Sequence, residues 1–113
     1  MSETITLLFT GLATLLILLS LPLKFNKVKP NWLYGFRTPT TVSNPDVWYA
    51  INRKTANQTI ILALVMIAVA VGLYYYGALS DEWLIGINSA LAFIGLTFIT
   101  IKGILKARKL ALE

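Results

Sequence analysis

Residues 59–76 read TIILALVMIAVAVGLYYY, a run of mostly apolar side chains without a single charged residue. Two similar runs occupy residues 5–23 and 83–101. Each is close to the roughly 20 helical residues that cross the hydrocarbon core of a bilayer. Of the 113 residues, 57% are hydrophobic and 13% are charged, whereas about 25% are charged in ordinary globular domains. The sequence therefore predicts an all-α membrane protein with three transmembrane helices.

We expect residues 1–113 to form one membrane module, with spans at about 5–23, 59–76 and 83–101 and a polar cytoplasmic loop at 24–44. A cleaved signal peptide is the alternative for the first run. Such a signal begins with basic residues and has a shorter apolar core. Here the residues before the run carry no basic side chain, and three lysines follow it, at Lys24, Lys27 and Lys29. This pattern favours a retained helix.

The second helix is predicted to be longer than its membrane span. Asn44-Pro45-Asp46 is typical of a helix start: Asn44 can cap, Pro45 suits the first turn, and Asp46 faces the positive end of the helix dipole. The pattern predicts one helix from about Pro45 to Tyr76, which would measure roughly 48 Å. Its first three or four turns should therefore lie in or beyond the membrane interface as an amphipathic extension.

The distribution of charge predicts an orientation. All ten Lys and Arg residues fall in two segments, six within 24–54 and four within 102–109, which two spans separate. Three of the five acids, Glu3, Asp81 and Glu82, fall on the opposite side. Because basic loops stay in the cytoplasm, we expect a multi-pass protein of the cell membrane with its amino terminus outside and its carboxyl terminus in the cytoplasm. Anionic lipid headgroups account for the net charge of +5, so no nucleic-acid partner is expected.

Aromatic, Gly, Pro and Arg residues gather between residues 31 and 58. On a helical wheel one face holds Trp48, Asn52, Thr55 and Thr59, and the opposite side holds Arg53, Lys54 and Asn57. Two interpretations remain open for this face. Trp48 and Asn52 can hold the backbone of the loop Tyr34–Pro39, since polar groups near lipid need partners. Alternatively, Asn52, Arg37 and Arg53 form a polar cleft for a headgroup, a peptide or another ligand.

The two arginines also carry alternative roles. Most interfacial arginines anchor to lipid phosphates, and Arg37 and Arg53 fit that role. A guanidinium between aromatic rings can also bind an anion with two parallel hydrogen bonds.

The segment Tyr34-Gly35-Phe36-Arg37-Thr38-Pro39, followed by Trp48 and by Asn52-Arg53, resembles the signature of the SdpI family of bacterial membrane proteins. The resemblance covers roughly residues 34–56, and the three-span layout suits the family. A glycine common in the family one turn beyond the Asn-Arg pair is Ala56 here. The resemblance marks as partner-binding or loop-holding residues Tyr34, Gly35, Arg37, Thr38, Pro39, Trp48, Asn52 and Arg53. The family's namesake is an immunity protein that protects a cell from its own secreted toxin and draws a repressor to the membrane.

Few other residues suggest chemistry. The chain has no Cys and no His, and no acid lies within a span, so neither a catalytic residue nor a metal or cofactor site is expected. Asn88 is the most polar side chain well inside a span, and we expect it to hydrogen-bond to a neighbouring helix. Small residues four apart, Ala68 with Gly72 and Gly86 with Ala90, permit close helix packing.

The resemblance implies a non-enzymatic membrane protein of the immunity or signalling kind, with a peptide toxin or a cytoplasmic regulator as partner. The alternative is a small transporter or channel subunit in which Asn88 lines a polar path. Because three helices bury little surface, we expect a homo-oligomer in either case.

Overall fold

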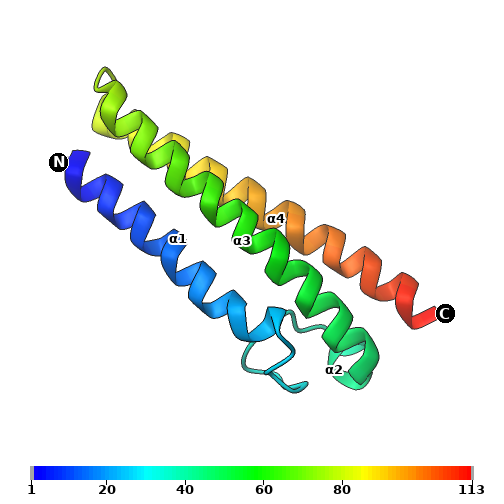
Figure 1. Cartoon of the computed structure of the whole chain (residues 1–113). Helices are drawn as coiled ribbons and strands as arrows, with labels where there is room; N and C mark the ends of the chain where they lie inside the picture. The colour runs from blue at the N-terminus through cyan, green and yellow to red at the C-terminus, as the bar shows by residue number, and fades with distance from the viewer. Residues whose placement is uncertain (1, 113) are drawn as a thin grey trace.

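The structure, a computed structural model, describes residues 2–112 and contains four helices. They are α1 (Ser2–Lys24), α2 (Pro39–Ser43), α3 (Pro45–Tyr76) and α4 (Asp81–Leu112). The three long helices form a bundle whose principal extents are 51 × 23 × 19 Å (Figure 1). Each of them is long and apolar enough to cross a membrane, so the predicted all-α class with three membrane-spanning helices is confirmed.

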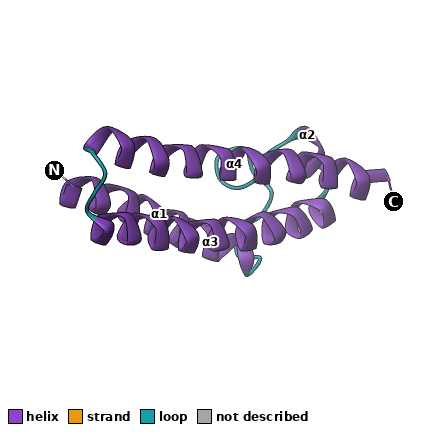
Figure 2. Cartoon of the chain, turned by 90° about the horizontal axis from the view of Figure 1, so that it is seen from above, coloured by secondary structure: helices purple, strands orange, loops and turns teal. Residues whose placement is uncertain are grey.

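α3 is the central helix of the bundle. Both α1 and α4 pack along it, whereas α1 and α4 make few contacts with each other. α1 runs beside α3 in the view of Figure 1 and α4 runs beside α3 in the view from above (Figure 2), so the two helices pack on different sides of α3. The position of the site described below depends on this arrangement.

The core changes in composition along the bundle. At the start of α1, Ile5 packs with Leu84 of α4 in one cluster. Midway, Ala13 of α1 lies in a cluster against which Leu91 of α4 packs. At the other end, α3 and α4 share a cluster against which the loop residue Phe36 packs, and no described α1 residue belongs to it. α1 and α4 therefore diverge towards this end, and the loop takes the place of α1.

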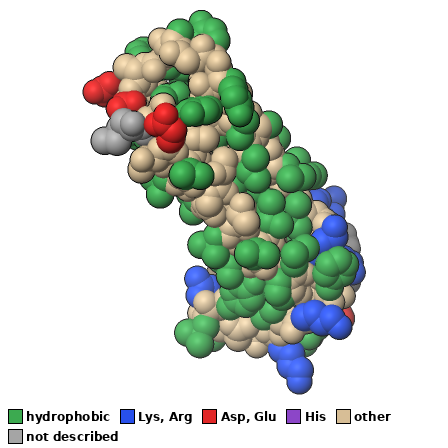
Figure 3. Space-filling model, turned by 60° about the vertical axis from the view of Figure 1, so that its left-hand side comes forward, with side chains coloured by type: hydrophobic (Ala, Val, Ile, Leu, Met, Phe, Trp, Pro, Cys, Tyr) green, Lys and Arg blue, Asp and Glu red, His purple; other side chains and the backbone are tan. Residues whose placement is uncertain are grey.

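Charge divides the two ends of the bundle. The Lys and Arg side chains gather at one end, here called the basic end, and most of the acidic side chains at the other, the acidic end (Figure 3). Between them the surface is apolar: Leu7 is 71% exposed and Phe93 74% exposed. So large an apolar surface is rare on soluble monomers, but it matches the hydrocarbon core of a bilayer.

The caps of α3 explain its bounds. The Asn44 side chain accepts hydrogen bonds from the backbone N–H groups of Asp46 and Val47, at 3.1 and 3.4 Å, and Pro45 follows it in the first turn. At the other end Gly77 adopts the left-handed conformation, with φ of 75°, and its N–H bonds to Leu73. The predicted helix Pro45–Tyr76 is confirmed.

Three details differ from the sequence prediction. The loop contains a helical turn, α2, and the basic tail continues α4 as far as Leu112. The close approaches predicted at the small-residue pairs are wrong, because a Cβ added at Gly72 or Gly86 would meet nothing within 4 Å. The close approach occurs at Gly95 instead, where an added Cβ would lie 2.5 Å from Leu62.

Candidate functional site

The loop between α1 and α2 folds back on the first turns of α3 at the basic end (Figure 1). Asn31 gives the loop its local shape, since its Oδ1 accepts from the N–H groups of Leu33 and Tyr34 at 2.8 and 2.7 Å. This Asx-type bonding bends the backbone without a glycine. The residues that carry the predicted signature follow immediately.

Asn52 of α3 holds the loop through its backbone. Its Oδ1 accepts from the Phe36 N–H at 2.6 Å, and its Nδ2 donates to the Trp48 carbonyl at 3.0 Å and, at 3.5 Å, to the Phe36 carbonyl. Asn52 is 1% exposed. A carboxamide suits this position because it offers a donor and an acceptor at once. Its polar groups are therefore directed at the protein itself.

Gly35 lets the loop approach α3 this closely. Its φ is +111°, a conformation that other residues rarely adopt. A Cβ at this position would lie 2.8 Å from Asn52 Oδ1 and 3.1 Å from the Trp48 ring. Both the backbone angle and the lack of space thus require glycine.

Trp48 and Tyr34 fasten the loop at two further points. Trp48 is completely buried, and its indole N–H donates to the Val28 carbonyl at 2.8 Å. The Tyr34 hydroxyl donates to the Leu19 carbonyl near the end of α1. Burial raises the pKa of the Tyr34 phenol above its ordinary value. The loop is thus hydrogen-bonded to α1 through Tyr34 and to α3 through Trp48.

Thr38 and Pro39 begin α2. The Thr38 side chain accepts from the Thr41 N–H at 3.2 Å, the Thr41 hydroxyl accepts from the Thr38 N–H at 2.8 Å, and Pro39 occupies the first turn. This reciprocal pair is a capping box. Thr41 is fully buried, and its hydroxyl also bonds to the Phe36 carbonyl at 3.0 Å.

Sequence reasoning missed the parts played by Thr41 and Phe36. A threonine three residues after Thr38 is a recognisable capping signal, although Glu or Gln is the usual partner. The Phe36 ring gives no such signal. The ring lies between α3 and α4. This follows from the surroundings of Gly103 in α4, where an added Cβ would lie 2.7 Å from the Phe36 ring and 3.2 Å from Thr55 of α3.

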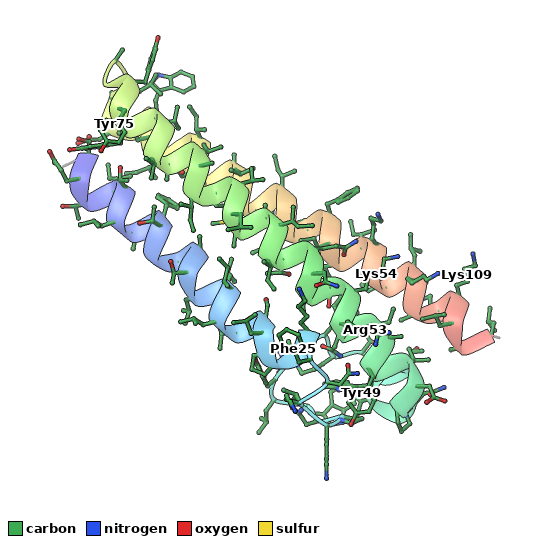
Figure 4. All side chains as sticks on the ribbon, viewed as in Figure 1. Phe25, Tyr49, Arg53, Lys54, Tyr75 and Lys109 are labelled. Atoms are coloured by element: carbon green, nitrogen blue, oxygen red, sulfur yellow. The ribbon has the colours of Figure 1, made fainter. Side chains whose placement is uncertain are left out.

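The two arginines lie outside this buried cluster. Arg37 is exposed, and its Nη1 donates to the Trp32 carbonyl at 2.7 Å. Arg53 is exposed on α3 (Figure 4). The carboxamide of Asn52 is turned inward to the loop, so the structure does not bring it together with the two guanidinium groups as one open polar surface. The exposed side chains of the loop include Arg37 and its neighbours Trp32, which is 58% exposed, and Leu33, which is 89% exposed.

Asn88 lies far from this cluster, near the start of α4. It is 3% exposed, and its Nδ2 donates to the Leu84 carbonyl of the same helix at 2.8 Å. The described residues show this bond within α4 and none from Asn88 to a neighbouring helix.

The bundle consists of three helices that are long and apolar enough to cross a membrane, with a hydrogen-bonded loop at its basic end. This is the architecture of a multi-pass helical membrane protein. The model of the SdpI/YfhL protein family matches residues 27–104, which include the loop, α2, α3 and most of α4. The chain belongs to this family. It is not known as a family of enzymes. No curated protein and no solved structure matches the chain.

Proposed function

We propose that the chain is a non-enzymatic membrane protein of the immunity or signalling kind, and that the loop surface Trp32–Leu33–Arg37 contacts its partner. The observation that carries the proposal is the fixing of this loop by hydrogen bonds with the buried side chains of Asn52, Trp48 and Thr41. A loop held in one conformation loses little entropy on binding. Exposed aromatic and Arg side chains are also the residues that most often dominate binding energy.

The basic end is proposed to lie in the cytoplasm, because positive residues are retained there. The loop would then meet a cytoplasmic regulator, or a peptide toxin that has already entered the membrane. At the acidic end the described chain offers the short connection 77–80 and the ends of helices. A binding surface for a folded partner is therefore better developed at the basic end.

The burial of Asn88 speaks against the transporter alternative. A residue that lines a polar path between subunits must face out of its own protomer. Asn88 is 3% exposed, and its amide bonds to its own helix.

Deletion of the gene in the native host tests the proposal. We expect the deletion strain to become sensitive to a secreted peptide toxin of that host or its neighbours, and the wild-type gene to restore survival. Arg37→Ala combined with Leu33→Ala should fail to restore it, although the variant protein reaches normal membrane levels. Arg108→Ala, an exposed arginine at the same end, serves as the matched control and should restore survival. Equal survival of the deletion and wild-type strains against all such peptides would count decisively against an immunity role.

A further inference from the structure

A cavity of about 240 Å³ lies beneath the loop, where α1 and α4 diverge. Its walls come from Leu16 and Ser20 of α1, Thr59 of α3 and Leu96 of α4. Phe36 and its neighbour in the loop close the cavity towards the basic end. Because α1 and α4 make few contacts with each other, the cavity opens sideways between them, towards the lipid.

Two hydroxyl groups in the cavity have no partner in the described part of the chain. Ser20 is 5% exposed and Thr59 is partly exposed, and neither hydroxyl makes a hydrogen bond to any of residues 2–112. The hydroxyls of Thr55 and Thr100, which also line the cavity, donate to carbonyls of their own helices at 2.9 and 2.8 Å. No buried side-chain nitrogen or oxygen of the described residues lacks a hydrogen-bond partner, so these two hydroxyl oxygens are accessible atoms of the cavity lining. Ser20 and Thr59 are therefore donors available to a ligand.

The lining suits an uncharged and largely apolar segment of a ligand. No charged side chain is among the described residues that line the cavity. The available hydroxyls can donate to an acceptor such as a carbonyl oxygen, and the leucine, isoleucine and phenylalanine side chains suit a hydrocarbon chain. Pockets for drug-sized ligands measure roughly 300–1,000 Å³, and a helix with its side chains is about 10–12 Å wide. The cavity is thus too small for a helix of a second copy and fits one segment of a chain.

The depth of the hydroxyls in the membrane points to the ligand. Ser20 precedes Lys24 by one helical turn, which is about 6 Å of rise. Lysines at the ends of spans lie at the headgroup level. A group one turn deeper lies where ester carbonyls join acyl chains to glycerol. An ester carbonyl accepts hydrogen bonds and donates none, which is the complement of two free hydroxyls.

We propose that this cavity binds the ester-linked end of one acyl chain of a membrane lipid, with Ser20 and Thr59 donating to the ester carbonyl oxygen. The chain continues along Leu16 and Leu96 towards the middle of the membrane. This inference is independent of the proposed function, since it concerns a cavity beneath the loop and not its outer surface. A lipid held here would pack directly against Phe36 and so against the residue that Asn52 fixes.

Photolabelling of the full-length protein in liposomes tests the proposal. One probe is a diacyl phosphatidylglycerol with a diazirine near the ester end of one chain, and the second is its ether-linked analogue, which lacks the carbonyl. We expect the ester probe to label residues 16–23, 55–59 and 96–100 about threefold to tenfold more than the ether probe, the ratio that one neutral hydrogen bond supports.

Variants separate the hydroxyl contacts from general lipid exposure. Ser20→Ala with Thr59→Val should abolish the preference for the ester probe. Thr14→Val with Thr97→Val, which removes two exposed hydroxyls from α1 and α4, should leave the preference unchanged. Where the first double variant does not fold, Ser20→Ala alone gives the same comparison. Equal labelling by the two probes in the wild type would overturn the proposal, and so would probe-dependent labelling that survives the loss of both hydroxyls. Cross-links between two copies through these segments would assign the cavity to a second chain and equally reject it.

Discussion

At the scale of single residues, one carboxamide does most to place the loop. Asn52 presents its acceptor to the Phe36 N–H and its donor to the carbonyls of Trp48 and Phe36. Backbone groups near lipid have little water to bond with. Asn52 bonds to both the N–H and the C=O of Phe36. It therefore removes much of the cost of leaving loop backbone groups without hydrogen-bond partners beside a membrane helix.

Replacing Asn52 with Leu should destabilise the protein. The change leaves the Phe36 N–H without its acceptor, and such a loss typically costs about 1–3 kcal/mol. The measurement is thermal unfolding in detergent. Asn57→Leu, at an exposed position further along α3, is the control and should change stability little. If the melting temperature is unchanged while biological activity is lost, Asn52 serves a ligand and not the loop.

Gly35→Ala and Gly72→Ala should have effects of opposite sign. At Gly35 the added Cβ meets Asn52 Oδ1 at 2.8 Å with φ at +111°, and strained backbone of this kind costs about 1–3 kcal/mol. At Gly72, within α3, the added Cβ meets nothing within 4 Å, so alanine should stabilise the helix by about 0.5–1 kcal/mol. Thermal unfolding of the two variants in the same detergent compares them directly. A stable Gly35→Ala protein would show that the loop does not occupy this position.

At the scale of elements, the helices could be predicted from sequence and the loop contacts could not. The bounds of α3 follow from Asn44, Pro45 and Gly77, whose effects are local to the chain. The bond between Asn52 and Phe36 joins residues 16 positions apart, and no periodicity reveals such a pair. The helical wheel placed Trp48 and Asn52 on one face, but the choice between loop support and a ligand depended on what that face contacts.

The same limit explains the wrong predictions about helix packing. Small residues four apart are frequent in apolar helices, so the pattern at Gly72 and Gly86 does not identify the packed face. The faces that meet are set by the larger side chains opposite them, such as Leu62 against Gly95. Asn88 illustrates a related point: an amide in an apolar helix can bond to its own preceding turn, as the bond to Leu84 shows, and needs no other helix.

The contact between the loop and α4 should be sensitive to Gly103. Gly103→Ala would bring a Cβ within 2.7 Å of the Phe36 ring, and overpacking of this kind costs about 1–3 kcal/mol. Phe36→Leu replaces the ring with a smaller side chain and should relieve part of that cost. The double variant with Gly103→Ala and Phe36→Leu should therefore be more stable than the sum of the two single effects predicts. Gly86→Ala, in the same helix but in open space, is the control. Strict additivity in thermal unfolding would mean that Phe36 and Gly103 do not touch.

At the scale of the whole molecule, charge is the strongest asymmetry. The ten Lys and Arg residues lie in two segments at the basic end, and Glu3, Asp81 and Glu82 lie at the acidic end (Figure 3). Moving either basic segment across the membrane would carry several positive charges through hydrocarbon. The proposed orientation, with the basic end in the cytoplasm, follows from this cost and from the retention of basic loops.

The absence of native cysteine makes the orientation easy to measure. We expect a membrane-impermeant maleimide to label Ser80→Cys in intact cells and to label Lys27→Cys and Arg108→Cys only after the cells are permeabilised. All three positions are exposed, so a difference in labelling reports the side of the membrane. The reverse pattern would invert the proposed topology and place the loop surface outside the cell.

The three tryptophans occupy three distinct settings. Trp32 is 58% exposed on the loop, Trp48 is completely enclosed, and Trp83 is 64% exposed at the start of α4. Indole emission depends on polarity, and soluble or lipid-attached quenchers reach each setting to a different extent. The protein therefore carries its own optical probes of the two membrane surfaces and of the interior. Two-at-a-time replacement of tryptophan by phenylalanine would leave one reporter in each variant, without an attached dye.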